Sequence, residues 1–256
     1  MEELKKNIGD ALINALSTEK RKPGLRMSNA GQPCERKLWY EINETEKGEE
    51  LRPETRLKFL YGHILEEVLL FLAEVAGHEV TGRQTQLSIE GIKGHRDAVI
   101  SGTLVDVKSA SSFSFKKFAT GGLKEDDPFG YLPQIQSYLF ASQEDPLVTD
   151  KSRAAFLVVD KTLGHLTLDV HEKDEKNYPE IYGKKKEVIT GSIPDRAFES
   201  VPFQQGGNEK LGVNCSYCAF SKTCWPEGRT FLYSYGPVTL VKIKKEPNVM
   251  EITNVS

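Results

Sequence analysis

The cysteines of this 256-residue chain constrain its fold more than any other feature. Of the four, Cys34 stands alone near the start, whereas Cys215, Cys218 and Cys224 lie together in the segment CSYCAFSKTCW. A CxxC pair followed by a third thiol is a metal-ligand spacing, and the fourth ligand must then be Cys34. The spacing alone does not distinguish zinc from an iron–sulfur cluster. In either case, a bound metal would join segments from both ends of the chain.

The composition is that of an ordinary globular protein, with 28% charged and 38% hydrophobic residues. The length predicts one or two domains. No apolar run reaches the roughly 18 residues of a membrane span, and the first residues, MEELKKNIGD, are charged where a secretory signal would be apolar. We therefore expect a cytoplasmic protein, in which cysteine pairs are more often metal ligands or redox groups than disulfides.

The net charge of −3 excludes a global electrostatic attraction to nucleic acid. Any affinity for DNA has to come from local basic patches, for which the candidates are Lys116 with Lys117, Lys184 to Lys186, and Lys242 with Lys244 and Lys245. Taken singly, each of these patches is more often solvated surface than a binding site.

Hydrophobic periodicity and break residues predict the order of the elements. From Pro53 on, apolar residues at 57, 60, 61, 64, 65, 68, 69 and 72 predict a long core-facing helix that ends before Gly77. The other predicted elements are helices over 1–22, 34–40, 132–143 and 172–190, and strands over 84–90, 94–100, 103–109, 154–160 and 165–170. Residues 236–256 are expected to form a loosely attached tail.

The segment GHRDAVISGTLVDVKSA predicts a hairpin that brings two carboxylates together. If Ser101 and Gly102 form its two-residue turn, Asp97 lies opposite Asp106. Opposed residues in an antiparallel pair have Cβ atoms ~5 Å apart, so the two charges repel unless something lies between them. A divalent cation such as magnesium or manganese is the natural occupant, because these metals prefer oxygen ligands.

Lys108 belongs to the same face of the predicted strand as Asp106, while Val105 and Val107 point to the other side. Its ammonium group could orient an attacking water, help to deprotonate it, or neutralise charge on a phosphate. The alternative interpretation of this segment is an exposed hairpin with solvated charges.

The long helix offers a third acidic ligand, Glu66, one turn after Gly62. The glycine leaves room for a strand or substrate to approach the carboxylate. The alternatives are that Glu67 or His63 is the ligand, or that Glu66 is a solvated helix residue.

A further pair, Gln134 and Tyr138 in LPQIQSYLF, shares one helix face. Such a pair can bind a phosphate or a flipped base, or steady a catalytic lysine. Polar residues beside an apolar stripe more often mark the boundary of a core.

Taken in order, Gly62xxxGlu66, Asp97, Asp106xLys108 and Gln134xxxTyr138, framed by Cys34 and the three later cysteines, resemble the PD-(D/E)XK nucleases of the RecB type that carry an iron–sulfur cluster. Within this family, the chain resembles the Cas4-like exonucleases and similar phage nucleases. The resemblance covers roughly residues 25–230. Two departures are that many Cas4-like members have histidine where Glu66 stands, and that Asp106 replaces a commoner glutamate.

The resemblance implies an α/β (α+β) fold with a central mixed β-sheet flanked by helices, a restriction-endonuclease-like core. It implies one nuclease domain over 1–235, with an iron–sulfur subregion formed by 1–50 and 205–230, followed by the tail 236–256. Relatives with this cysteine order hold a [4Fe-4S] cluster, which here would be structural and bound by Cys34, Cys215, Cys218 and Cys224. Tyr217, Phe220 and Trp225 would shield the cluster from water.

The resemblance also assigns roles in a magnesium- or manganese-dependent site. It makes Glu66, Asp97 and Asp106 metal ligands, with the backbone carbonyl of Val107 as a further one. Lys108 becomes the catalytic lysine, and Gln134 and Tyr138 fall on the accessory motif of the family.

The function that follows from the resemblance is a metal-dependent DNA exonuclease acting on single strands or DNA ends in replication, recombination or repair. The likeness to phage nucleases also implies a phage as one source of the gene. Its partners would be DNA and proteins of replication or recombination, with no membrane. Three alternatives stay open: a noncatalytic DNA-binding or assembly subunit with the same fold, a nuclease of CRISPR adaptation, and a zinc-stapled hydrolase of another phosphate ester.

Overall fold

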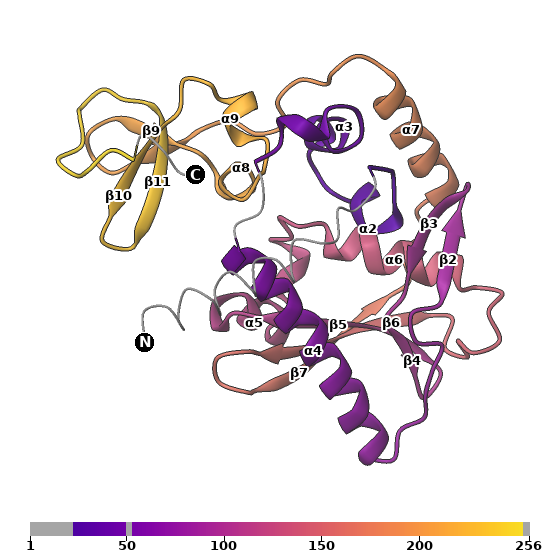
Figure 1. Ribbon diagram of the computed structural model, residues 1–256. Coiled ribbons are helices and arrows are strands. Elements are labelled where there is room, and N and C mark those ends of the chain that lie inside the picture. The colour runs from indigo at the N-terminus through magenta and orange to yellow at the C-terminus, as the bar shows by residue number, and fades with distance from the viewer. Residues whose placement is uncertain (1–22, 50–52, 253–256) are drawn as a thin grey trace, which may run out of the picture. The chain divides into compact units, whose positions relative to one another are not determined.

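The computed structural model describes residues 23–49 and 53–252, without the side chains of 53–55 (Figure 1). The helix predicted over 1–22 lies outside these residues. The chain divides into two compact units. The described parts of 1–31 and 51–186 form the sheet unit, and those of 32–50 and 187–256 form the cysteine unit. Over the described residues, no helix combines the length and apolar character that crossing a membrane requires.

The sheet unit is built on a five-stranded sheet in the order β1-β4-β5-β6-β7. Strands β5 and β6 are parallel and the other neighbours are antiparallel, so the sheet is mixed, as predicted. The strands are β1 (Val80–Thr81), β4 (Ala98–Ile100), β5 (Thr103–Ala110), β6 (Arg153–Asp160) and β7 (Leu166–Glu172). A separate hairpin pairs β2 (Gln86–Ile89) with β3 (Ile92–His95).

The helices of this unit connect and cover the strands (Figure 1). They are α2 (Met27–Ala30), α4 (Pro53–Val75), α5 (Ser112–Ala119), the 3-10 turn η2 (Gly122–Lys124), α6 (Tyr131–Ala141) and α7 (Tyr178–Thr190), whose last turn belongs to the cysteine unit. The predicted helices over 53–76 and 132–143 are thus confirmed, and the helix predicted over 172–190 is confirmed from residue 178 on. Helix α5 was not predicted, although Phe115 and Phe118 lie one turn apart and face the core, because the segment SFSFKKFA is only eight residues long.

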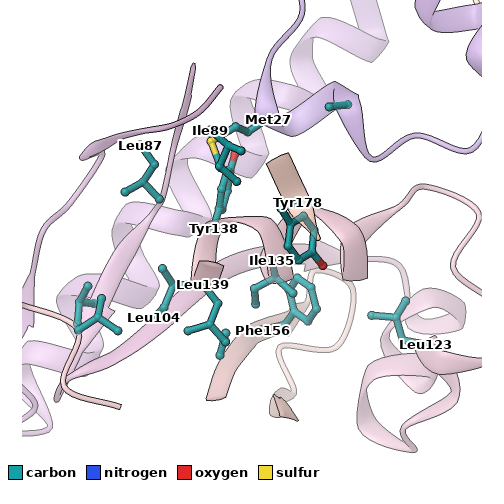
Figure 2. Packing of buried hydrophobic residues seen from close by; sticks show 14 of the residues in the cluster. Met27, Leu87, Ile89, Leu104, Leu123, Ile135, Tyr138, Leu139, Phe156 and Tyr178 are labelled. Carbon is teal, nitrogen blue, oxygen red and sulfur yellow. The ribbon is translucent and has the colours of Figure 1, made fainter. Parts of the chain in front are cut away.

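The alternation of side chains along β5 separates two apolar cores. Leu104 packs with Phe156 of β6 and with Ile135 and Leu139 of α6, and Figure 2 shows this larger core. Val105 and Val107 point the other way and pack with two leucines of α4, Leu69 and Leu70. Asp106 and Lys108 therefore lie on the face of the sheet that carries α6, and Val105 and Val107 fix that orientation, as predicted.

The hairpin between β4 and β5 has the predicted register. Ile100 pairs with Thr103, Val99 with Leu104 and Ala98 with Val105. Both turn residues have positive φ, +47° at Ser101 and +80° at Gly102, as a type I′ turn requires. The turn thereby sets which residues of the two strands face each other.

The core-facing stripe predicted on α4 is only partly correct. Leu65 and Leu69 pack on the sheet, but Leu60, Tyr61, Ile64, Val68 and Leu72 are exposed. The buried Leu70 lay outside the predicted stripe. The reason is that apolar residues occur on more than one side of this helix, so periodicity alone does not select the side that meets β5.

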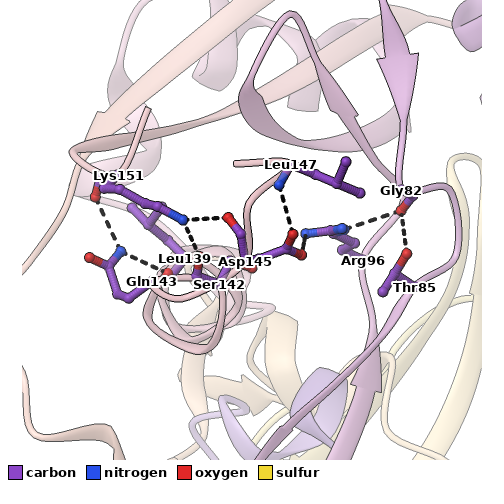
Figure 3. Close-up of polar contacts among 9 residues, drawn as sticks. All are labelled: Gly82, Thr85, Arg96, Leu139, Ser142, Gln143, Asp145, Leu147 and Lys151. Atoms are coloured by element: carbon purple, nitrogen blue, oxygen red, sulfur yellow. Dashed lines mark hydrogen bonds and ion pairs between the residues drawn. The ribbon is translucent and has the colours of Figure 1, made fainter. Parts of the chain in front are cut away.

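A buried ion pair anchors the chain directly before Asp97 (Figure 3). Arg96 is 1% exposed, and its guanidinium lies 2.6 Å from Asp145 Oδ2 while its Nε donates to Gly82 O. Asp145 in turn accepts from Leu147 N, and Lys151 Nζ donates to Asp145 O. These contacts hold the start of β4 against the loop after α6 and so fix the position from which the Asp97 side chain extends.

The cysteine unit gathers segments from both ends of the sequence. It contains α3 (Glu35–Asn43), η1 (Thr45–Lys47), α8 (Val213–Ser216), α9 (Ser221–Cys224) and a four-stranded sheet in the order β10-β11-β9-β8. These strands are β8 (Val201–Phe203), β9 (Asn208–Lys210), β10 (Arg229–Tyr233) and β11 (Gly236–Lys242). The prediction of a loose tail from residue 236 is wrong for β11, which pairs with β10 and β9 and buries Leu240.

The turn of the β4–β5 hairpin generates a prediction about stability. Replacing Gly102 with Ala places a methyl group at positive φ and against the hydroxyl of Thr149. Gly91 of the β2–β3 turn has a similar φ, +76°, but open space around it, so Gly91→Ala is the matched control. We expect the control to lower the free energy of unfolding by about 1–2 kcal/mol and Gly102→Ala by about 1–3 kcal/mol more. Urea denaturation measures both, and equal losses would contradict the contact with Thr149.

Candidate active site

The hairpin places the two predicted carboxylates beside each other. Asp97 directly precedes β4 and, one step beyond the pair Ala98 and Val105, lies opposite Asp106. Asp97 Oδ2 accepts a hydrogen bond from the backbone N of Val107 at 2.8 Å. Asp106 is 2% exposed. The carbonyl oxygen of Val107 as a metal ligand stays a prediction.

The electrostatics of Asp97 reflect this crowding. Burial first, and then the negative charges of Asp106 and Glu66, raise the pKa of Asp97 to about 8. The positive charge of Lys108 and the hydrogen bond from Val107 act in the opposite direction but do not offset these effects. In the absence of a cation, Asp97 therefore holds its proton at neutral pH, because a second buried negative charge is unfavourable.

Lys108 completes the cluster from the same strand. Its ammonium forms an ion pair with Asp106 Oδ2 and lies 5.3 Å from the centre of the Tyr131 ring. Burial lowers the pKa of Lys108, but the carboxylates of Asp106 and Asp97 outweigh this effect and leave the pKa raised. Lys108 is therefore a cation at neutral pH and not a base.

Glu66 approaches the cluster from α4 and is held by a residue that the sequence did not reveal. Gln84 Nε2 donates to Glu66 Oε1 at 2.7 Å, and Gln84 N donates to Asp97 O at 3.1 Å. Burial, partly offset by the hydrogen bond from Gln84, raises the pKa of Glu66, and the charge of Asp106 contributes. Gln84 thus links two of the three predicted ligands. No sequence motif marks it, since the link depends on the fold.

The neighbours of Glu66 are less suited to the site. Glu67 pairs with Arg83 at 3.2 Å, and His63 is exposed. The prediction that Gly62 leaves room for close approach of a strand is wrong, and its part about a substrate stays a prediction. A Cβ there would lie 3.8 Å from Ser109 Oγ, which is ordinary contact.

Gln134 and Tyr138 of α6 form the floor of the site. Gln134 Nε2 donates to the Tyr138 hydroxyl at 3.4 Å, and Tyr138 is 2% exposed. Burial raises the pKa of Tyr138, and the hydrogen bond from Gln134 only partly opposes it. Tyr131, at the start of the same helix, is a further member that sequence reasoning missed. Its contact with Lys108 joins residues far apart in the chain.

The donor set of this cluster fits a hard divalent cation in chemical type. Asp97 and Asp106 repel each other, and Asp106 Oδ2 is buried without a hydrogen-bond donor of regular geometry. Both conditions are relieved when a cation binds to carboxylate oxygens. As the side chains stand, however, no group of three or more His, Cys, Asp or Glu residues within 23–49 and 53–252 is gathered closely enough to hold a metal ion.

The four cysteines line one pocket of the cysteine unit, together with Arg36, Lys37, Arg196 and Trp225. Cys34 precedes α3, and its Sγ accepts from Lys37 N at 3.4 Å. Burial raises the pKa of Cys218 to about 11 and also raises the pKa of Cys215. The donor set fits a metal group, because metal binding is what converts such buried thiols to thiolates.

The predicted shielding of the thiols by aromatic rings is correct in part. Trp225 is 7% exposed and lines the pocket, with Arg196 stacked on its ring at 3.9 Å. Phe220 is buried and stacks on Tyr40. Tyr217 is 77% exposed, so it does not shield the thiols. The position of Tyr217 within the CxxC segment of the sequence does not predict whether its ring points toward the thiols or toward solvent.

Comparisons with known proteins give only distant likenesses. No protein-family model and no curated protein matches the chain. The structure of SSO0001 has a TM-score of 0.48 at 16% identity and covers 86% of this chain and 96% of its own. The structure of a phage-related exonuclease from Haemophilus somnus 129PT has a TM-score of 0.35 at 18% identity. The match covers 50% of this chain and 65% of that one. The structure of an alkaline exonuclease from Laribacter hongkongensis has a TM-score of 0.39 at 16% identity. The match covers 71% of this chain and 91% of that one. Because these TM-scores are below 0.5, the likenesses carry no conclusion about function.

The carboxylate pair generates a prediction about pH. The unfolded chain releases the proton of Asp97 near pH 4 and the folded protein near pH 8, so the folded state binds more protons in between. In the presence of a chelator, the free energy of unfolding should therefore fall as the pH rises through this window. Asp97→Asn removes the titration, and we expect its stability relative to wild type to increase steadily from pH 5 to pH 8 in urea denaturation.

The control for this experiment is Asp150→Asn. Partial burial of Asp150 is outweighed by hydrogen bonds from Ser152 and by the charge of Arg153, which lower its pKa. Asp150 is therefore ionised in both states above about pH 5, and its variant should show a constant difference from wild type there. A constant difference for Asp97→Asn as well would refute the repulsion between the two carboxylates.

Proposed function

We propose that this protein is a metal-dependent DNA exonuclease of the PD-(D/E)XK type that hydrolyses phosphodiester bonds in single strands or at DNA ends. The observation that carries the proposal is the arrangement of Asp97, Asp106 and Lys108 on one hairpin. It brings two repelling carboxylates and a fixed cation to one place. A role in replication, recombination or repair follows from that activity.

The carboxylates would hold magnesium or manganese, with Asp97 and Asp106 as central ligands and Glu66 and the carbonyl of Val107 as further ones. When bound, such a cation supplies positive charge beside the phosphate and makes a water molecule more acidic. A bound cation would favour the ionised form of Asp97 over the protonated form of the metal-free protein, because it would balance the charges of the two carboxylates.

Lys108 provides a permanent positive charge next to the scissile phosphate. Of the roles that an amine could play there, general-base catalysis is disfavoured, because the neighbouring carboxylates raise its pKa. The ion pair with Asp106 and the ring of Tyr131 hold the ammonium in place. Lys108 is thus arranged to stabilise the negative charge that builds up on phosphate oxygens during hydrolysis.

Gln134 and Tyr138 act as positioning residues in this proposal. Tyr138 is almost fully buried, so it supports the cluster from below and does not touch DNA. Its hydroxyl keeps its proton because its pKa is raised, and it remains a hydrogen-bond donor. Gln134 fixes the orientation of that hydroxyl.

We also propose that Cys34, Cys215, Cys218 and Cys224 bind a [4Fe-4S] cluster with a structural role. The four thiols line one pocket, and three of the other pocket residues, Arg36, Lys37 and Arg196, are cations that can balance the charge of four thiolates. The thiols belong to segments far apart in the sequence, so a cluster here would tie α3 to α8 and α9.

Cleavage assays test the nuclease proposal. Asp106→Asn and Lys108→Ala should each lower the rate of magnesium- or manganese-dependent degradation of end-labelled DNA by at least about 100-fold. The first removes a ligand of the cation, and the second removes the positive charge beside the reacting phosphate. Asp150→Asn and Lys173→Ala alter exposed or loop charges of the sheet unit and should keep the wild-type rate. Equal rates for Asp106→Asn and wild type in a clean preparation would eliminate the proposal.

Iron analysis tests the cluster. Cys218→Ser should lose iron, lose the brown colour of the purified protein and lower the melting temperature, with activity falling as a consequence. Ser221→Ala changes another residue of the same pocket and should keep the iron. If the wild-type protein is colourless and contains zinc, the bound metal is zinc and the cluster proposal is wrong. If Cys218→Ser lacks iron but keeps the normal melting temperature, the structural role is ruled out.

A further inference from the structure

A cavity of about 200 Å³ opens beside Lys108 in the sheet unit. It lies between the end of β5, helix α5 and the loop that leads into α6. Its lining combines cations, hydroxyl groups and aromatic rings, and it includes Lys117, Lys161, Ser111, Ser114, Phe129 and Tyr131. Lys108, which forms an ion pair with Asp106, also lines it, so the cavity borders the carboxylate cluster.

The charged side chains of the cavity favour an anion. Lys117 Nζ lies 2.5 Å from Asp126 Oδ2, so that charge is balanced within the protein. The side chain of Lys161 is exposed, and the structure gives it no ion pair or hydrogen bond among the described residues. Lys161 therefore adds to the lining one positive charge that no carboxylate of the described residues balances. The ammonium of Lys117, which also lines the cavity, can turn toward a ligand as well.

Hydrogen-bond donors lie on the same wall. Ser111 precedes α5 and accepts from Ser114 N at 3.3 Å, and the two hydroxyls are also 3.3 Å apart. Both hydroxyls line the cavity and, together with Lys161, provide donors for one phosphate group.

The aromatic part of the cavity lies in the loop before α6. Phe129 is 47% exposed, and its ring centre lies 5.7 Å from that of Tyr131. An exposed ring next to a cationic cavity is what single-stranded nucleic acid uses for base stacking, because every unpaired base presents a flat face. A base inside a duplex cannot present that face.

We propose that this cavity is a subsite for one unpaired nucleotide, adjacent to the phosphodiester bond that is cut at Asp106 and Lys108. Its phosphate binds between Lys161, Lys117 and the hydroxyls of Ser111 and Ser114, and its base stacks on Phe129. The volume is below the roughly 300 Å³ of the smaller drug-sized sites, so the cavity accommodates part of one nucleotide. This inference rests on the proposed nuclease function and specifies its substrate as a single strand.

Binding measurements without cleavage test the subsite. In the presence of a chelator, the fluorescence anisotropy of a labelled oligothymidylate and of a labelled blunt duplex is followed as full-length protein is added. Lys161→Ala and Phe129→Leu should each weaken binding of the single strand about tenfold and leave duplex binding unchanged. The leucine keeps an apolar side chain and removes only the ring. Lys161→Ala should also reduce the salt dependence of single-strand binding.

Matched controls are Lys173→Ala and Phe71→Ala, which remove an exposed lysine and an exposed phenylalanine of the same unit that do not line the cavity. Losses no larger than those of the controls, or equal losses on duplex and single strand, would overturn the subsite. Thymidine 5′-monophosphate should displace the oligothymidylate from wild type, whereas thymidine without phosphate should not. Displacement by both with equal strength would also overturn it.

The two proposals fail in different ways. If no divalent metal supports cleavage but Lys161→Ala and Phe129→Leu lose single-strand binding, the subsite stands and the nuclease proposal falls. If wild type cleaves DNA and both variants bind and cleave single strands as wild type does, the nuclease stands and the subsite falls.

Discussion

The mutual repulsion of Asp97 and Asp106 is the constraint on which the rest of the site depends. Two carboxylates are held opposite each other by a short hairpin and are largely withdrawn from water. The ion pair of Arg96 with Asp145 and the hydrogen bond from Val107 N prevent Asp97 from moving away. The pair is therefore stable only when a proton or a cation is bound. The site thus favours binding of a positive charge.

Strand β5 supplies both the chemistry and its support. Its inward residues, Val105 and Val107, are committed to the core with α4, so Asp106 and Lys108 have to face α6. On that side they meet Tyr131 and the buried Tyr138, which limit the movement of the lysine. The same strand ends at the cavity beside Lys108, where the structure offers cations and an aromatic ring to a nucleotide.

The thiol pocket belongs to a different unit and follows a different physical logic. Its buried thiols resist ionisation, and the cations around them become useful only when the sulfur atoms carry negative charge. A bound metal group would favour the negatively charged form of the thiols, as a divalent cation would favour the negatively charged form of the carboxylates. In both places the chain holds groups whose charged form is unfavourable until a partner binds, which is how ligand binding becomes coupled to stability.

The sequence by itself determined the hairpin register and the pairing of Asp97 with Asp106, because a two-residue turn and strict alternation are local rules. The mixed sheet was predicted only by the resemblance of the motifs to the PD-(D/E)XK nucleases. It also indicated the gathering of Cys34 with the later cysteines in one pocket. Only the tertiary structure decided which side of α4 meets the sheet, that β11 joins a second sheet, and that Gln84, Tyr131 and helix α5 surround the cluster. These features depend on contacts between segments far apart in the chain, and such contacts leave no periodic signal in the sequence around either partner.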